Sequence, residues 1–391
     1  MTQLLASLPG DDHDVGVTAT GAALVETSGA EEQISVASQW RLMWWRFRKH
    51  KLALLGAIVV ALFYVAALGA DFFAYSNPYD SGSVRANVPP QPIYFFDNGE
   101  FGPFVYGLKR ERDTATLKLI YTADPSVKIP LQFFAKGFEY DFLGIFPADV
   151  HIIGPVDGAA EETIYLLGTD IQGRDLWSRI MFGTRTSLTI GLAGVLLSLV
   201  LGVVLGGISG FFGGWVDTLI QRLIEIIRSV PVIPLWLGLT AAMPKDWDIL
   251  LVYFFITIII SFIGWTELGR VVRGRFLALR HEDFVAAAEL AGSSTRRIIF
   301  VHMLPLLTSH IIAATTLALP VMIISETSLS FLGLGLRIPA ISWGTLLHDA
   351  QNVQALAITP WLLIVAIPVI VAILAFNLFG DGLRDAADPY A

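Results

Sequence analysis

Long runs of apolar residues constrain this chain more than any other feature. Each run has about twenty residues or more, which is the length an α-helix needs to cross a hydrocarbon core ~30 Å thick. The composition agrees, because 54% of the residues are hydrophobic and only 15% are charged. We therefore expect an all-α polytopic membrane protein with six transmembrane helices. The expected spans are 52–70, 186–212, 217–243, 249–265, 305–331 and 361–379.

Basic residues predict the orientation of these spans. Residues 40–51 are basic and aromatic and directly precede the first run, and a second basic region lies between residues 267 and 302. Lys and Arg gather on the cytoplasmic side of a membrane, and Trp favours its interface with water. Both termini are therefore expected in the cytoplasm, and residues 1–39, which are polar, are expected to form a disordered tail there. The formal charge of -8 argues against a nucleic-acid partner, whereas membrane lipid is an expected contact.

Residues 73–185 are the largest interruption between apolar runs. Short segments such as 91–96 and 117–121 resemble strands separated by turn residues, so we expect a mostly β extracytoplasmic insertion between helices 1 and 2. Near its end comes the run LGTDIQGRD at residues 167–175. We interpret its Asp and Arg residues as ion pairs that fix a turn, and not as a metal site or a catalytic loop.

Four glycines recur at four-residue spacing in the second span: Gly202, Gly206, Gly210 and Gly214. Small residues at this spacing line one face of a helix and let a second helix approach closely. A nucleotide-binding loop is the alternative, but no strand precedes these glycines. The pattern therefore predicts a packing face.

Two positions suggest a translocation path. Pro231 and Pro234 interrupt the third span just after Arg228, so a break is expected there, and we place these three residues along the path. Glu326 is the one acid in the fifth span, and its distance from Pro305 predicts a position near the outer interface. We assign it to the path as well, with a structural or gating role favoured over a proton relay. Trp343, further along, is expected in an interfacial ring.

A short polar segment at residues 284–305 lies between two spans. Asp283 favours the start of a helix over residues 284–291, and Gly292 is a natural stop for that helix. A residue among 293–295 is expected to cap a second short helix before Pro305. The segment therefore predicts an elbow, helix–Gly–helix, which a partner protein could hold.

This elbow resembles the "EAA" loop in the membrane subunits of bacterial ATP-binding cassette importers. The resemblance rests on Ala286, Ala287 and Ala288, on Gly292, and on the Leu-Pro pair that ends at Pro305. Ala286 occupies the position of the motif's Glu, and the nearest acid is Glu289. The run at 167–175, the run SLSFLGLG at 328–335 and the ending GDGLRD at 380–385 resemble the dipeptide and oligopeptide branch of that family.

The resemblance implies a permease subunit in the bacterial inner membrane that is not itself an enzyme. Its expected partners are a second permease subunit, two ATP-binding subunits and an extracytoplasmic substrate-binding protein. No catalytic residue, metal or cofactor is assigned to this chain, because ATP and Mg would be bound by the ATPase subunits. The expected cargo is di- or oligopeptides, and oligosaccharides, opines or nickel remain alternatives, as does a secondary transporter. The residues expected to couple to the ATPases are Phe284, Ala286, Ala287, Ala288, Glu289, Gly292 and Pro305.

The chain is accordingly divided into five expected parts. A cytoplasmic tail is followed by a flank with the first span, by the insertion and by the permease core, in which residues 267–305 form the cytoplasmic coupling loop. A short cytoplasmic tail follows. Their bounds are 1–39, 40–72, 73–185, 186–385 and 386–391.

Overall fold

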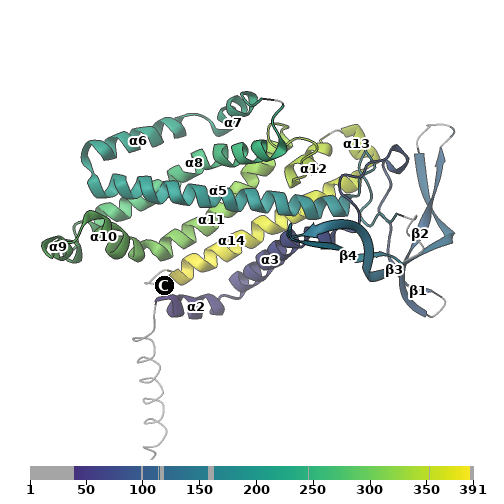
Figure 1. Ribbon diagram of the computed structural model, residues 1–391, viewed down its shortest axis with the longest axis horizontal. Helices are drawn as coiled ribbons and strands as arrows, with labels where there is room; N and C mark the ends of the chain where they lie inside the picture. Colours follow the sequence, from purple (N-terminus) through teal and green to yellow (C-terminus); the bar gives the residue numbers. More distant parts are fainter. Residues whose placement is uncertain are drawn as a thin grey trace, which may run out of the picture.

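Long helices run side by side, and a small β-sheet lies at one end of them, in a computed structural model of the chain (Figure 1). The structure describes residues 39–387 apart from 98–99, 113, 115–118, 157–162, 245 and 352. Most of each expected cytoplasmic tail therefore lies outside the described residues. We call the end of the bundle with helices α9 and α10 the elbow end, and the end with the sheet the sheet end.

The fold is mostly helical. Its helices are α2 Gln39–Lys49, α3 Lys51–Leu68, α4 Ala70–Phe73, α5 Leu176–Phe212, α6 Gly214–Ser229, α7 Val232–Ala241, α8 Ile249–Leu279, α9 Asp283–Leu290, α10 Thr295–Arg297, α11 Leu304–Phe331, α12 Trp343–Asp349, α13 Val353–Ile358 and α14 Ala366–Ala387. Short 3-10 segments at Ser83–Arg85 and Pro360–Val365 and a π-helical segment at Ile298–Met303 complete them.

Five helical segments among the described residues are long and apolar enough to cross a membrane. A sixth span results if α6 and α7 are counted together, but the two helices are bent by 88° at the break between them. The expected interruption of the third span at Pro231 is thus confirmed. Pro234 lies in the first turn of α7, where its missing N–H leaves no hydrogen bond unmade.

Helices α5 and α8 pack closely because glycines line their contact. A Cβ at Gly206 would collide with the carbonyl oxygen of Gly269, and one at Gly210 would lie 2.7 Å from that of Arg273. Gly202 faces Leu268 in the same way. The predicted packing face is therefore confirmed for these three glycines. It is wrong for Gly214, which begins α6 with a φ of 57° and has open space where a Cβ would lie.

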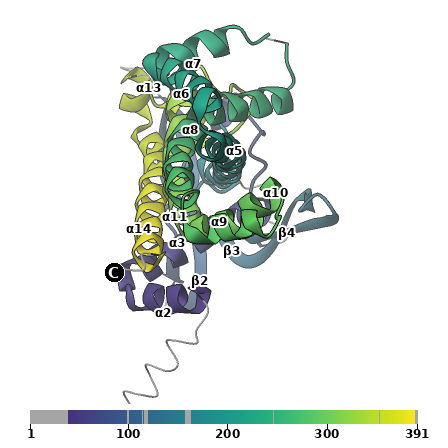
Figure 2. The same ribbon diagram turned by 90° about the vertical axis from the view of Figure 1, so that its left-hand side faces the viewer.

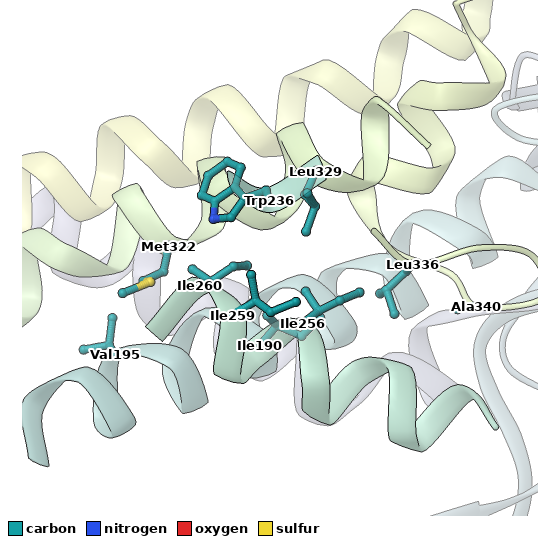
Figure 3. Packing of buried hydrophobic residues seen from close by; sticks show 10 residues of the cluster. All are labelled: Ile190, Val195, Trp236, Ile256, Ile259, Ile260, Met322, Leu329, Leu336 and Ala340. Carbon is teal, nitrogen blue, oxygen red and sulfur yellow. The ribbon is translucent and has the colours of Figure 1, made fainter. Parts of the chain in front are cut away.

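The largest core cluster joins α5, α7, α8 and α11 (Figure 3). Ile190, Ile256, Ile260 and Met322 meet there, and Trp236 of α7 packs onto the same cluster. Burying side chains of this size contributes about 1.5–3 kcal/mol each when the alternative is water. Because α7 takes part in this core, the bent second half of the third span is fixed against the bundle.

The sheet is an antiparallel meander in the order β1-β2-β3-β4. Its core side chains, Val105, Ile129 and Leu131, pack with Ile164. A mostly β insertion was expected between residues 73 and 185, and the structure shows it in part, as this four-stranded sheet. The strands are β1 Tyr94–Asp97, β2 Glu100–Arg112, β3 Leu119–Phe142 and β4 Phe146–Pro155.

Helix α5 begins ten residues before the expected start of the second span at 186. The Asp175 side chain caps it by accepting a hydrogen bond of 2.8 Å from the Ser178 N–H. The run at 167–175 therefore leads straight into the helix, and the boundary placed at residue 185 falls inside α5. The first turns of α5 are not apolar enough to be recognised as part of a span from hydropathy alone.

Candidate functional site

The elbow end carries an exposed two-helix turn. Helix α9 is followed by Gly292, which has a φ of 75°, a conformation that side-chain-bearing residues rarely adopt. The Gly292 N–H donates to the Glu289 carbonyl at 2.9 Å, and the Ser293 N–H donates to the Ala288 carbonyl at 3.0 Å. Ser294 then caps α10 by accepting a hydrogen bond from the Arg297 N–H. The predicted helix, glycine stop and cap are all confirmed.

One side of the elbow is fixed to the bundle. Val285 is buried with Phe276 of α8, and with Ile298, Met303 and Leu307 of the segment that follows. Pro305 lies in the first turn of α11, where it needs no hydrogen-bond donor. The elbow is consequently held by apolar packing on one face only, and its position is set by α8 and α11.

The opposite face of the elbow is open. Ala286, Ala287, Glu289 and Gly292 are exposed, and Phe284 is partly so. Leu290 is 90% exposed, the highest value for a large apolar side chain among the described residues. The sequence analysis did not single out Leu290. Helical periodicity places it on the side of α9 away from Val285, and this could have identified it as exposed. An exposed apolar side chain beside small alanines suits a surface that another protein covers.

Basic side chains gather at the elbow end from distant parts of the sequence. Helix α2, with Arg46, Arg48 and Lys49 in its last turn, lies at the same end of the bundle as α9 and α10 (Figure 1). Arg296 and Arg297 lie on α10. The two basic regions that the sequence suggested for one side of the membrane are therefore on one side of the fold.

An open cavity of about 810 Å³ lies between α6, α8 and α11. Its wall is mostly apolar, with Ile263, Leu317 and Val321 among the lining residues. Its polar members are Arg228, Thr266, Glu267, His310 and Arg384. Nη1 of Arg228 lies 2.5 Å from Oε2 of Glu267, which joins α6 to α8. Hydrophobic walls with a few convergent polar groups are typical of ligand-binding cavities.

The structure does not bring all four candidate path residues together. Arg228 lines the cavity, as does Val232, whereas Pro231 and Pro234 shape the break beside it and are not among the lining residues. Glu326 is fully buried away from the cavity, and its carboxylate accepts hydrogen bonds from Ser187 at 2.8 Å and Ser330 at 2.9 Å. Glu326 therefore lies in the packed contact between α5 and α11, which we call the α5–α11 junction.

Trp343 contributes to the same junction. Its backbone N–H donates to Ser187 Oγ at 3.1 Å, and its indole N–H donates to Thr184 Oγ1 at 3.2 Å. The expectation of an interfacial ring is wrong, because the side chain is completely buried and its ring packs edge-on against Phe63. The indole N–H is satisfied by a hydrogen bond inside the bundle, so it does not need the membrane surface for a partner.

At the sheet end, the run at 167–175 forms the expected ion-paired turn. Asp170 accepts from Arg174 at 2.7 Å and from Arg179, and both arginines reach Asp349 of α12. Asp175, beside them, accepts a hydrogen bond of 2.6 Å from the Tyr75 hydroxyl. Burial raises the pKa of the Asp175 carboxyl to about 6, although the hydrogen bonds from Tyr75 and Ser178 oppose that rise.

A bundle of membrane-crossing helices, with an open cavity between them and an exposed elbow at one end, defines an integral membrane protein of the transport type. The family model for the binding-protein-dependent transport system inner membrane component matches residues 202–390, and the model for the N-terminal TM domain of oligopeptide transport permease C matches residues 38–90. The chain belongs to this family of inner-membrane transport components.

Curated relatives support the same family. The oligopeptide transport system permease protein OppC of Escherichia coli (strain K12) is 41% identical over 229 residues, which are 58% of this chain and 73% of that protein. OppC of Bacillus subtilis (strain 168) is 30% identical over 365 residues, or 93% of this chain and 94% of that protein. The dipeptide transport system permease protein DppC of Lactococcus lactis subsp. cremoris is 33% identical over 379 residues, which are 94% of this chain and 96% of that protein.

Among solved structures, a chain of the MetNI methionine ABC transporter in an inward-facing conformation aligns with a TM-score of 0.41 and 14% identity. The alignment covers 54% of this chain and 96% of that chain.

Proposed function

We propose that the chain is a permease subunit of an ATP-binding cassette importer for di- and oligopeptides. In this proposal it has six spans, its elbow end and both termini face the cytoplasm, and its sheet end faces outward. The named relatives transport oligopeptides and dipeptides. The clustering of basic side chains from α2, α8 and α10 at the elbow end supports the orientation.

The observation that carries the proposal is the exposed face of α9. This face is held in place from behind by Val285 and is turned back by Gly292, so it is a rigid surface and not a loose loop. A partner that grips it moves α8 and α11 with it, because the elbow packs on both helices. Those helices form two walls of the cavity, so motion at the elbow changes the cavity.

The division of work follows from this arrangement. Two ATP-binding subunits, which hold ATP and Mg, would dock on this elbow and on that of a second permease subunit. A binding protein would deliver the peptide at the sheet end, and the cavity between α6, α8 and α11 would form part of the path. In this proposal the chain supplies part of the transport path and the surface on which an ATPase docks, and the ATPase subunits hydrolyse ATP.

Purification of the tagged chain from its native host in mild detergent tests the proposal. Mass spectrometry should identify an ATPase with a P-loop and a second six-span subunit in the complex. After reconstitution into liposomes, ATP hydrolysis should rise when a peptide-loaded binding protein is added, and not with nickel or a sugar. A chain recovered only as a homo-oligomer would count against the importer, and stimulation by a non-peptide cargo would move the proposal to another branch of the family.

A further inference from the structure

An apolar hairpin tip projects from the sheet. Strands β3 and β4 pair up to Phe142 and Phe146, and residues 143–145 form the connecting turn. Leu143 is 52% exposed, Ile145 70% and Phe146 63%. Three large apolar side chains at one exposed hairpin tip would be poorly placed in water, where turns normally carry polar residues.

The base of this hairpin is fixed to the outer end of the first span. The His151 ring of β4 is buried, with Nδ1 2.9 Å from the carbonyl oxygen of Asp71 and Nε2 3.0 Å from that of Phe138. Asp71 lies in α4, directly after α3, and its carboxylate pairs with Arg185 of α5 at 2.5 Å. The hairpin is therefore attached, through α4, to the sheet ends of α3 and α5.

Ile145 lies six positions before His151, so the tip lies at most about 20 Å from this attachment at ~3.3 Å per strand residue. In Figure 1 the hairpin curves back toward the sheet ends of α3 and α5 instead of away from them. Figure 2, which looks along the helices, shows the hairpin beside the bundle and not over it. The hairpin therefore lies beside the sheet ends of the helices, and a bilayer that surrounds the helices would end close to it.

Aromatic side chains at the base of the hairpin also lie close to the end of the first span. Phe134 of β3 is 69% exposed and contacts Phe72 of α4, with ring centroids 6.1 Å apart. Phe72 lies four residues beyond the end of α3 at Leu68, so the two rings lie near the level at which the first span ends. Exposed apolar side chains therefore lie both at the tip and at the base of the hairpin, close to the end of the first span.

We propose that the β3–β4 tip, Leu143, Ile145 and Phe146, inserts into the outer leaflet of the membrane. The contact is apolar: Glu139, Asp141 and Asp149 flank the tip, so attraction to anionic headgroups does not drive it. The tip anchors the sheet against the bilayer and fixes the orientation of the insertion above the bundle. This inference does not depend on the cargo or on the ATPase partners.

The chain contains no cysteine, so a single Ile145→Cys variant takes a spin label at one defined position. The labelled protein is placed in phosphatidylcholine nanodiscs, and collision rates of the label with oxygen and with a water-soluble nickel chelate are measured. Leu143→Cys repeats the measurement at the tip. Lys109→Cys, on an exposed position of β2, is the matched control.

Labels at 143 and 145 should collide more with oxygen than with the nickel chelate, and the label at 109 should do the opposite. Replacing part of the lipid with phosphatidylglycerol should not deepen the tip labels. Tip labels as accessible to nickel as the control would overturn the proposal. So would labels that become protected only when a binding protein or a second permease subunit is added, since that result assigns the tip to a protein contact.

Discussion

Arg228 of α6 and Glu267 of α8 form an ion pair of 2.5 Å on the wall of the open cavity. Their side chains are 40% and 73% exposed, so water screens the pair, and such pairs contribute only about 0–1 kcal/mol to stability. The pair therefore contributes little to the stability of the fold, and its main effect is to place two charged groups on the wall of the cavity.

Neutralising this pair should affect transport more than stability. We expect Glu267→Gln to change the free energy of unfolding by less than about 1 kcal/mol, while peptide uptake into proteoliposomes falls several-fold. Glu225→Gln is the matched control, because Glu225 pairs with Arg222 on the same helix at 2.6 Å but does not line the cavity. Equal uptake by both variants would remove Arg228 and Glu267 from the path.

The contact between α5 and α8 requires a glycine at position 206. Gly206→Ala places a methyl group against the Gly269 carbonyl, and overpacking of this kind typically costs about 1–3 kcal/mol. Gly274→Ala, on α8, meets open space and should be neutral or stabilise by up to about 1 kcal/mol. Thermal unfolding in detergent compares the two, and a Gly206→Ala protein as stable as Gly274→Ala would contradict the packing.

The left-handed conformation of Gly292 should be needed for coupling. A Cβ at this position meets nothing within 4 Å, so a substitution acts through the backbone alone. We expect Gly292→Val, which opposes the φ of 75° by about 1–2 kcal/mol, to lose most peptide-stimulated ATP hydrolysis. Gly292→Asn tolerates the conformation and should keep most of it. Loss of coupling to the same extent in both variants would show that a side chain on the elbow surface, and not the left-handed conformation of residue 292, causes the loss.

The buried Asp175 predicts a pH dependence at the sheet end. A carboxyl with a pKa raised from 3.8 to about 6 favours folding below pH 4, and that contribution, up to about 3 kcal/mol, is lost as the pH rises through 6. Asp175→Asn still caps α5 but does not titrate. The stability of the wild type relative to this variant, measured by thermal unfolding, should therefore fall between pH 4 and 7. A difference that is constant with pH would show that the carboxyl does not titrate in this range.

Local chemistry made the elbow predictable. Asp283 before an alanine-rich run, Gly292 as a stop and Ser294 as a cap each act within one helical turn, so neighbouring residues decide the structure. Pro231 likewise interrupts its own helix. The glycine face of α5 could be predicted as far as Gly210 because helical periodicity places those residues on one side.

Features that depend on distant partners could not be predicted. The burial of Trp343 rests on Ser187 and Thr184, more than 150 residues earlier in the chain. Glu326 was recognised as unusual, but Ser187, one of the two hydroxyl groups that donate to it, lies on another helix, α5, 139 residues earlier. Gly214 fits the four-residue spacing, yet the helix ends before it, and the end of α5 at Phe212 is not marked by a change in hydropathy.

The most direct test of the account is photo-crosslinking from the exposed face of α9. The complex is produced in its native host with p-benzoyl-phenylalanine in place of Ala287, and in a second strain in place of Lys109 on the sheet. We predict that illumination links the chain to a P-loop ATPase from position 287 and not from position 109. If position 287 captures no ATPase, or both positions capture it equally, the elbow is not the coupling surface.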